Sequence, residues 1–313
     1  LAALLMIGTQ AGFTFSGLKD FMASGRELAH AELIGALLIA GFGTLISLFP
    51  FHSWAAPAYA SAPAPVAMMH AGVLKKFGLY GLFMFQPLME TGFLPWTNIL
   101  LVLLVCNVIW VGYVTVNQKR LDLLLGNSSV MHMGYIFLAF AALVVSGSAE
   151  ANPWALKGAA LLMLAHGLTI ALLFLLCGQI EKQTGTLEIN SLGGLSTRLP
   201  RMAFVFGLAG MASIGLPGLA NFPGEFMVFF SGFAGFSNGF GPVQIATILC
   251  LWGLVIGAVY MLRAYRNIFQ GDLSKASAYA TGLQPSERAA NYFLVIALAV
   301  FGFFPTLVLQ FFS

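Results

Sequence analysis

The chain has 313 residues, of which 59% are hydrophobic and only 8% are charged, and its mean hydropathy is +0.89. Soluble globular domains carry about 25% charged residues, so this composition indicates an integral membrane protein. Its apolar runs have helical length, which excludes a transmembrane β-barrel with alternating strands of about 10 residues. The net charge of +3 gives no indication of nucleic-acid binding.

We expect an all-α polytopic protein with eight spans, because an apolar run of about 20 residues can cross a bilayer. Residues 1–15 look like the end of a further span, followed by a mixed-charge loop. We interpret the sequence as the C-terminal part of a longer protein, forming a single transmembrane domain over residues 1–313. The loop carries Lys19, Asp20, Arg26 and Glu27, and the predicted spans are 31–51, 64–87, 96–117, 123–146, 154–180, 199–234, 242–265 and 288–312.

Two of these spans are predicted to be broken helices. Prolines interrupt the end of the first span near 50–63, in FPFHSWAAPAYASAPAP, and prolines and glycines interrupt the sixth near 215–224, in IGLPGLANFPGEF. The broken spans are five spans apart, so they run in opposite directions through the bilayer. Interrupted helices in corresponding positions of two inverted halves indicate a transport site. Ordinary proline kinks in a helix bundle are the alternative.

The second span carries Lys75 and Lys76 at its middle, about 12 residues and roughly 18 Å of helix from either end. Lysines at this depth are costly to bury and usually mark ion or proton routes. The alternative is that a buried carboxylate holds them only to fix helix packing. Successive helix residues point about 100° apart, so the two lysines are not expected to face the same neighbour.

Other titratable residues lie inside the predicted spans. His132 and His166 are suited to passing protons because histidine titrates near neutral pH, although each also fits a packing role. Glu225 follows the second break, where it is expected to bind free amide groups at a half-helix start or to cap that helix. His52 and His70 flank the first break and are candidate accessory residues, with core or capping roles as the alternative.

No motif for chemistry on a substrate is present, since the sequence contains no Walker loop, dinucleotide fingerprint, HExxH motif or serine-hydrolase pattern. Cys106, Cys177 and Cys250 lie in apolar runs and form no CxxC pair, so neither an iron–sulfur cluster nor a disulfide framework is indicated. We expect no catalytic residue, cofactor or metal site in this chain.

The basic residues predict the orientation by the positive-inside rule. One side, interpreted as cytoplasmic or its equivalent, would carry most of them, and the C-terminus would lie outside. The predicted cytoplasmic set is Lys119, Arg120, Lys182, Arg198, Arg201, Arg263, Arg266, Lys275 and Arg288, and the opposite set is Lys19, Arg26 and Lys157.

The motifs FPFHSW, APAPVAMMHAGVLKKFGLYG, SSVMHMGY, LLMLAHGL, LGGL and GLPGLANFPGEF resemble those of the antiporter-like proton-pumping subunits of complex I (NADH:quinone oxidoreductase) and of their relatives in Mrp antiporters and membrane-bound hydrogenases. The resemblance covers nearly all of the chain, and the glutamate in GEF is similar to that of the M-type chain, subunit 4. It implies an antiporter-like fold with inverted five-helix repeats. The two broken helices of that fold match the predicted breaks.

The resemblance also implies a proton relay. Lys76, His132, His166 and Glu225 match the family's relay positions. In contrast, Leu45 stands where a lysine is usual, and WAAPA lacks the aspartate of the usual WLPDA run. KRLDLLL likewise departs from the usual DxKRL that precedes the histidine motif. Lys75 is expected to turn toward the first span and supply the function that Leu45 lacks, or else to pair with an acid from outside the sequence.

The resemblance implies a proton-translocating subunit of a redox enzyme in a bacterial inner membrane or an equivalent energy-coupling membrane. NADH, FMN, iron–sulfur clusters and quinone would be bound by partner subunits, and the expected partners are other membrane subunits and the lipid bilayer. An Mrp-type cation/proton antiporter or hydrogenase subunit is the first alternative. A non-pumping scaffold subunit, suggested by Leu45, is the second.

Overall fold

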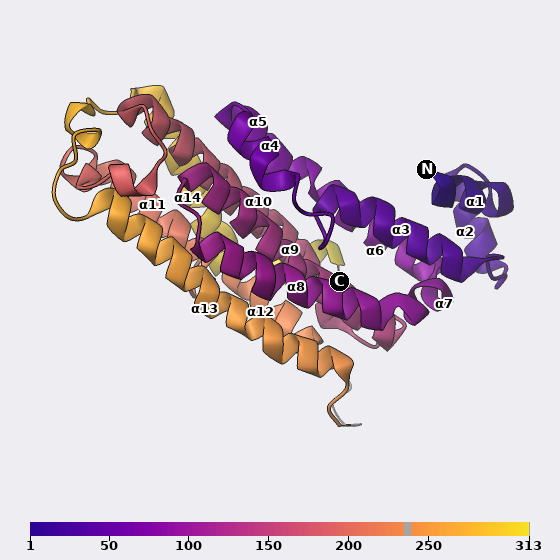
Figure 1. Cartoon of the computed structure of the whole chain (residues 1–313). Helices are drawn as coiled ribbons and strands as arrows, with labels where there is room; N and C mark the ends of the chain where they lie inside the picture. Colours follow the sequence, from indigo (N-terminus) through magenta and orange to yellow (C-terminus); the bar gives the residue numbers. More distant parts are fainter. Residues whose placement is uncertain (235–238, 313) are drawn as a thin grey trace.

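The computed structural model describes residues 1–234 and 239–312. Within these residues the secondary structure is helical apart from one isolated bridge between Arg120 and Glu188. The long helices run side by side in a bundle, and the N-terminal helices lie at one end of it (Figure 1). The predicted all-α polytopic architecture is confirmed.

The N-terminal region differs from the prediction. Helices α1 (Ala2–Ala11) and α2 (Phe15–Ala23) precede the first predicted span, and α2 carries Lys19 and Asp20, which were expected in a loop. Thr14 caps α2 by accepting a hydrogen bond from the Gly17 amide at 3.1 Å, while Phe21 packs inward and both charged residues stay exposed. The charges lie on the outer face of a short helix, and only Arg26 and Glu27 lie in a loop.

Five helices among the described residues are long and apolar enough to cross a membrane. They correspond to five of the predicted spans. The last span is shorter than predicted, because α14 ends at Phe303 before Pro305 and a short helix, α15 (Thr306–Leu309), follows. The five are α8 (Thr97–Val116, continuous with the preceding turns from Thr91), α9 (Leu121–Ser146), α10 (Pro153–Thr184), α13 (Pro242–Phe269) and α14 (Pro285–Phe303).

The remaining three spans are divided into shorter helices. α3 (Ala31–Ile46) stops where Ser47 adopts a left-handed φ of 71°, and the chain resumes as α4 (Ala55–Ser61). The sixth span divides into α11 (Pro200–Ser213) and α12 (Asn221–Ser231). Both predicted breaks are therefore confirmed. The first begins three residues earlier than expected, and the second covers residues 214–220, where 215–224 was expected.

The second span is segmented in a way that the sequence did not indicate. It consists of α5 (Ala64–Met69), a π-helical turn over His70–Leu74, and α6 (Lys76–Phe85), followed by the four-residue α7 (Glu90–Phe93) after a short turn. The amide of Lys75 bonds to the carbonyl of His70, five residues earlier, at 3.0 Å. Such π-helical turns add a residue to one helical turn and often occur at functional sites.

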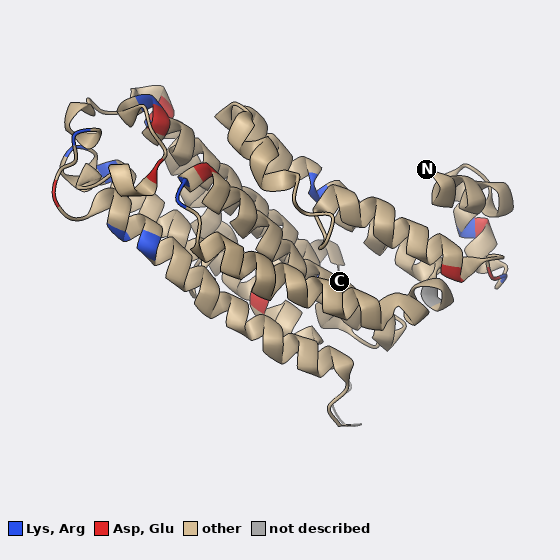
Figure 2. Cartoon of the chain, viewed as in Figure 1, with Lys and Arg blue, Asp and Glu red and all other residues tan. Residues whose placement is uncertain are grey.

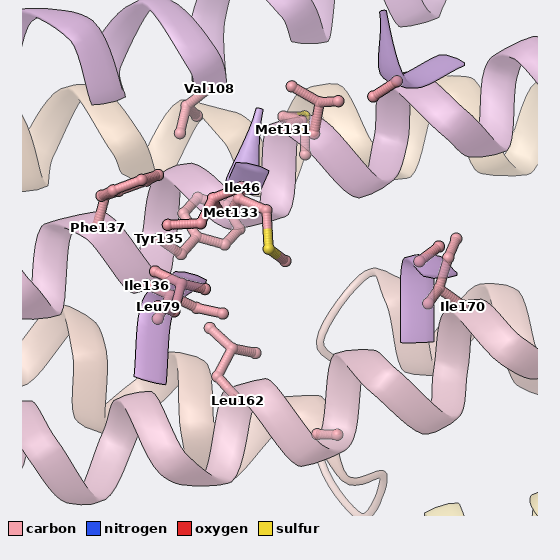
Figure 3. Packing of buried hydrophobic residues seen from close by; sticks show 14 of the residues in the cluster. Ile46, Leu79, Val108, Met131, Met133, Tyr135, Ile136, Phe137, Leu162 and Ile170 are labelled. Atoms are coloured by element: carbon pink, nitrogen blue, oxygen red, sulfur yellow. The ribbon is translucent and has the colours of Figure 1, made fainter. Parts of the chain in front are cut away.

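Helix α9 lies at the centre of the bundle. Of its most apolar stretch, 94% is buried, against 11% for α14, and α9 contacts α4, α8, α10, α12 and α13. Tyr135, Ile136 and Phe137 of α9 pack among apolar side chains such as Leu79 and Leu162 (Figure 3). A helix that is enclosed on all sides has no lipid-facing side, so polar groups on α9 face other protein groups.

Charged residues gather at two ends of the bundle, and the long helices between them are mostly uncharged (Figure 2). One end joins α10, α11, α13 and α14, and the other holds α1 and α2. Salt bridges among the described residues are confined to Arg120–Asp122 and Lys182–Glu287, each with 2.7 Å between charged atoms. The Asp122 carboxylate hydrogen-bonds Arg120, and this contact raises the pKa of the guanidinium.

Candidate proton-relay site

The two lysines of the second span are both buried but face different surroundings. Lys75 has 0% and Lys76 has 7% of its surface exposed. Lys76 Nζ donates a hydrogen bond to the carbonyl of Ala71 in the π-helical turn. Lys75 Nζ has no hydrogen-bond partner in the described structure and lies over the ring of Tyr59 on α4, 5.9 Å from its centroid. The prediction that the lysines face different neighbours is confirmed.

Lys75 lies beside the first break, among aromatic side chains. The Tyr59 hydroxyl is 3.4 Å from Nδ1 of His70, and the Trp54 ring meets His70 edge-on with centroids 5.5 Å apart. His52 stacks on Phe49, and its Nδ1 is buried without a partner. Within the described residues no carboxylate forms an ion pair with Lys75. Leu45, the position of the usual family lysine, is 38% exposed.

The π-helical turn brings the second span against α10. A Cβ atom on Gly167 would come within 2.6 Å of the Gly72 carbonyl oxygen, so only glycine permits this approach. His166 precedes Gly167 and is 2% exposed. The close approach explains how Lys76, on one helix, comes within electrostatic range of His166 on another.

His132 and His166 form a stacked pair at the centre of the bundle. Their ring centroids are 5.0 Å apart and their planes differ by 23°. His166 Nε2 lies 3.2 Å from the Ser129 hydroxyl, while its Nδ1 is buried without a partner among the described residues. The two histidines predicted from separate spans are therefore in contact.

Both ring nitrogens of His132 face carbonyl oxygens. Nδ1 is 2.8 Å from the Ser128 carbonyl and Nε2 is 2.9 Å from the Ser213 carbonyl. A carbonyl oxygen only accepts hydrogen bonds, and a neutral imidazole has only one N–H. The geometry therefore fits the doubly protonated imidazolium. Ser213 is the last residue of α11, where the negative end of the helix dipole further favours a cation.

Glu225 lies in α12, which follows the second break, whereas Ser213 lies at the end of α11 before that break. Glu225 is 3% exposed, and its Oε1 has no partner among the described groups. The expectation that it binds amide groups or caps the half-helix is wrong, because α12 begins at Asn221, four residues earlier, without a side-chain cap. The carboxylate instead lies against Gly215, where φ is 79° and a Cβ atom would overlap Oε2.

Several polar residues of this site were not predicted. Asn107 on α8 holds the first break, with its side-chain oxygen accepting from the Phe49 amide at 2.5 Å and its nitrogen donating to the Ser47 carbonyl at 3.2 Å. Ser128 and Ser129 precede His132 by four and three residues, so they share its helix face. The available signal was that polar residues survive inside apolar spans. The remaining polar residues of the site that were not predicted are Tyr59, Tyr135, Thr169, Asn221 and Tyr260.

The titratable residues of the site do not form a metal centre. Within the described residues there is no group of three His, Cys, Asp or Glu side chains that could hold a metal ion. Cys106, Cys177 and Cys250 are free thiols. The arrangement is instead a row of single titratable groups from the second span, α10, α9 and α12, which suits transfer of protons between neighbours.

The sequence of residues 1–251 matches the family described as NADH:quinone oxidoreductase/Mrp antiporter, transmembrane. The chain belongs to this family. NAD(P)H-quinone oxidoreductase chain 4 1 of Synechococcus sp. strain JA-2-3B'a(2-13) is 32% identical over 305 residues, covering 96% of this chain and 56% of that protein. The protein of the same name from Synechococcus elongatus is 34% identical over 298 residues, covering 94% and 53%. The chain therefore spans about half the length of the curated relatives it matches.

Solved structures agree with this family membership. A chain of respiratory complex I from Thermus thermophilus with bound NADH has a TM-score of 0.86 and 26% identity, over 99% of this chain and 63% of that one. A chain of the Mrp complex from Dietzia sp. DQ12-45-1b shares the fold, with a TM-score of 0.77 and 18% identity over 99% and 66%. The antiporter-like fold is confirmed, and the relatives' name, chain 4, agrees with the M-type resemblance.

Proposed function

We propose that this chain is a proton-translocating membrane subunit of a complex I-like NADH:quinone oxidoreductase, with no active site of its own. The observation that carries the proposal is the row of buried titratable side chains from four spans, in which His132 contacts both His166 and the end of a broken helix. Buried ionisable groups are costly in a membrane protein and usually serve transport.

The relay would begin at the lysines and end at Glu225. The charge on Lys76 acts on His166 and on His132, so loading or unloading one site changes the cost of protonating the next. His132 would receive a proton from the direction of His166 and release it toward Glu225. Lys75 would load from the first break, with His52 and His70 as accessory groups.

The energy would come from electron transfer in partner subunits, which would hold NADH, FMN, iron–sulfur clusters and quinone. In this reading the chain forms one transmembrane domain whose neighbours are other membrane subunits and lipid. Large exposed apolar side chains support such neighbours, among them Phe77, Phe226 and Trp252, each more than half exposed. We assign the chain to a bacterial inner membrane or its equivalent, with the C-terminus outside.

An Mrp-type antiporter subunit is a second candidate, favoured by the fold shared with the Dietzia complex. The two functions differ in their neighbouring subunits and in their dependence on electron donors. Purifying the native complex and measuring NADH:quinone reductase activity separates them. Cation-dependent proton exchange without redox activity would overturn the proposed function.

The direct test uses the complete complex in proteoliposomes and measures protons moved per electron. Lys76→Ala and Glu225→Gln are expected to assemble, to retain electron transfer with uncoupler, and to move fewer protons. Lys119→Ala and Glu181→Gln are matched controls, since both residues are exposed. Normal proton stoichiometry in both relay variants would instead assign the chain to a scaffold role.

A further inference from the structure

The step from His132 to Glu225 needs a group that both accepts and donates a proton. The nitrogens of His132 face the carbonyls of Ser128 and Ser213, which accept hydrogen bonds but have no proton to pass on. Among the described residues, Glu225 forms no hydrogen bond to either histidine, and its Oε1 is unpartnered. A hydroxyl group meets the requirement, because it is both donor and acceptor.

Two buried hydroxyls lie at this point. Ser128 Oγ is 2.7 Å from the phenol oxygen of Tyr260, and either atom can be the donor. Ser128 is 1% exposed and Tyr260 is 0% exposed. The pair joins α9, which carries His132, to α13, which carries none of the predicted relay residues. The serine hydroxyl belongs to the residue whose carbonyl His132 already contacts.

The phenol of Tyr260 also reaches the second break. The Ser213 side chain and the Glu225 charge both act on this phenol. Gly215, two residues after Ser213, lies directly against the Glu225 carboxylate. Tyr260 is therefore hydrogen-bonded to the residue that His132 contacts, and it lies within electrostatic range of Glu225.

We propose that the hydroxyls of Ser128 and Tyr260 carry the proton between His132 and Glu225, an inference that rests on the proposed function. The His132 ring leaves the Ser128 carbonyl, an N–H bond of the imidazolium breaks, and Ser128 Oγ accepts its proton. The serine O–H proton passes to the Tyr260 oxygen, and the phenol proton passes to the carboxylate. His132 becomes neutral, Glu225 becomes a carboxylic acid, and both hydroxyls are regenerated.

The test compares Tyr260→Phe and Ser128→Ala with Glu225→Gln in the complete complex. Both hydroxyl variants are expected to lose as much proton translocation as Glu225→Gln, with electron transfer retained under uncoupler. Ser128→Thr keeps a hydroxyl and is expected to pump normally. Tyr265→Phe is the matched control on α13, because the Tyr265 ring packs against Phe206 and Phe269 and its hydroxyl forms no hydrogen bond among the described residues.

An infrared readout separates proton transfer from a structural role. A carboxylic acid band that is missing in Glu225→Gln reports protonated Glu225. This band should appear during turnover in the unmodified complex and be absent in Tyr260→Phe. Normal pumping in Tyr260→Phe beside defective Glu225→Gln would overturn the hydroxyl link alone. Normal pumping in Glu225→Gln and Lys76→Ala would overturn the proposed function as well. If Tyr260→Phe does not assemble, Ser128→Ala and Ser128→Thr decide the question.

Discussion

The two broken helices of this chain satisfy their free backbone groups in different ways. At the first break, between α3 and α4, the amide side chain of Asn107 binds Ser47 and Phe49. At the second, between α11 and α12, the carbonyl of Ser213 is bound by His132. An asparagine side chain does not titrate, whereas a histidine side chain can gain or lose a proton. The first break is therefore held by a side chain with a fixed protonation state, and the second by one whose hydrogen bonds depend on its protonation state and tautomer.

The largest effect is expected from Asn107→Leu. This change leaves a buried amide and carbonyl at the first break without partners, which costs several kcal/mol for each group in a membrane. We expect a loss of roughly 3 kcal/mol or more in stability and little assembled complex, measured by thermal dissociation of the solubilised complex. Asn117→Leu is the control, because the Asn117 side chain is exposed and, among the described residues, bonds only the Tyr113 carbonyl of the helix that it ends. Equal stability of the two variants would contradict the fixed character of the first break.

His132→Phe is expected to have a smaller effect on stability and to abolish proton transfer. It leaves the Ser213 carbonyl unpaired, at a cost of about 2 kcal/mol, and removes the titratable group. His132→Gln can still donate to Ser213, so it should recover most of the thermal stability but none of the pumping. If His132→Gln pumps normally, the second break does not depend on a titratable residue.

Gly215→Ala tests the position of Glu225. The positive φ of 79° makes alanine unfavourable by about 1 kcal/mol, and its Cβ atom would displace the Glu225 carboxylate. Gly271→Ala has the same kind of strain, with φ of 80°, but no atom within 4 Å of the added Cβ. Both variants should lose similar stability, and only Gly215→Ala should pump less. Equal proton stoichiometry in the two variants would show that Gly215 does not position Glu225 for proton transfer.

The smallest change in stability is expected from Lys75→Leu. Its amine is fully buried without a hydrogen-bond partner in the described structure, so replacing it with an apolar side chain should leave stability unchanged or raise it by about 1 kcal/mol. Proton translocation should fall, since Lys75 is the buried titratable amine next to the first break. Undiminished pumping would show that Lys75 does not substitute for the lysine absent at position 45.

The candidate site was partly predictable from the sequence. Lys76, His132, His166 and Glu225 stand out because each is a titratable residue inside an apolar span, and the cost of burying such groups makes them informative one at a time. Their contacts were not predictable in this way. Ser128, Tyr260 and Asn107 are uncharged, so hydropathy does not distinguish them from ordinary packing residues, and their roles depend on partners more than 20 residues away.

The sequence by itself determined five of the spans and both breaks, because hydropathy over about 20 residues and the missing amide of proline are local properties. It also determined that two adjacent lysines diverge, since this follows from the rise and twist of a helix. Only the tertiary structure decided that a π-helical turn precedes Lys75, that Glu225 lies against Gly215 and does not cap α12, and that His132 lies between two carbonyls. Those features depend on how α9, α10 and the broken helices pack together, and packing between distant segments leaves no periodic signal along the chain.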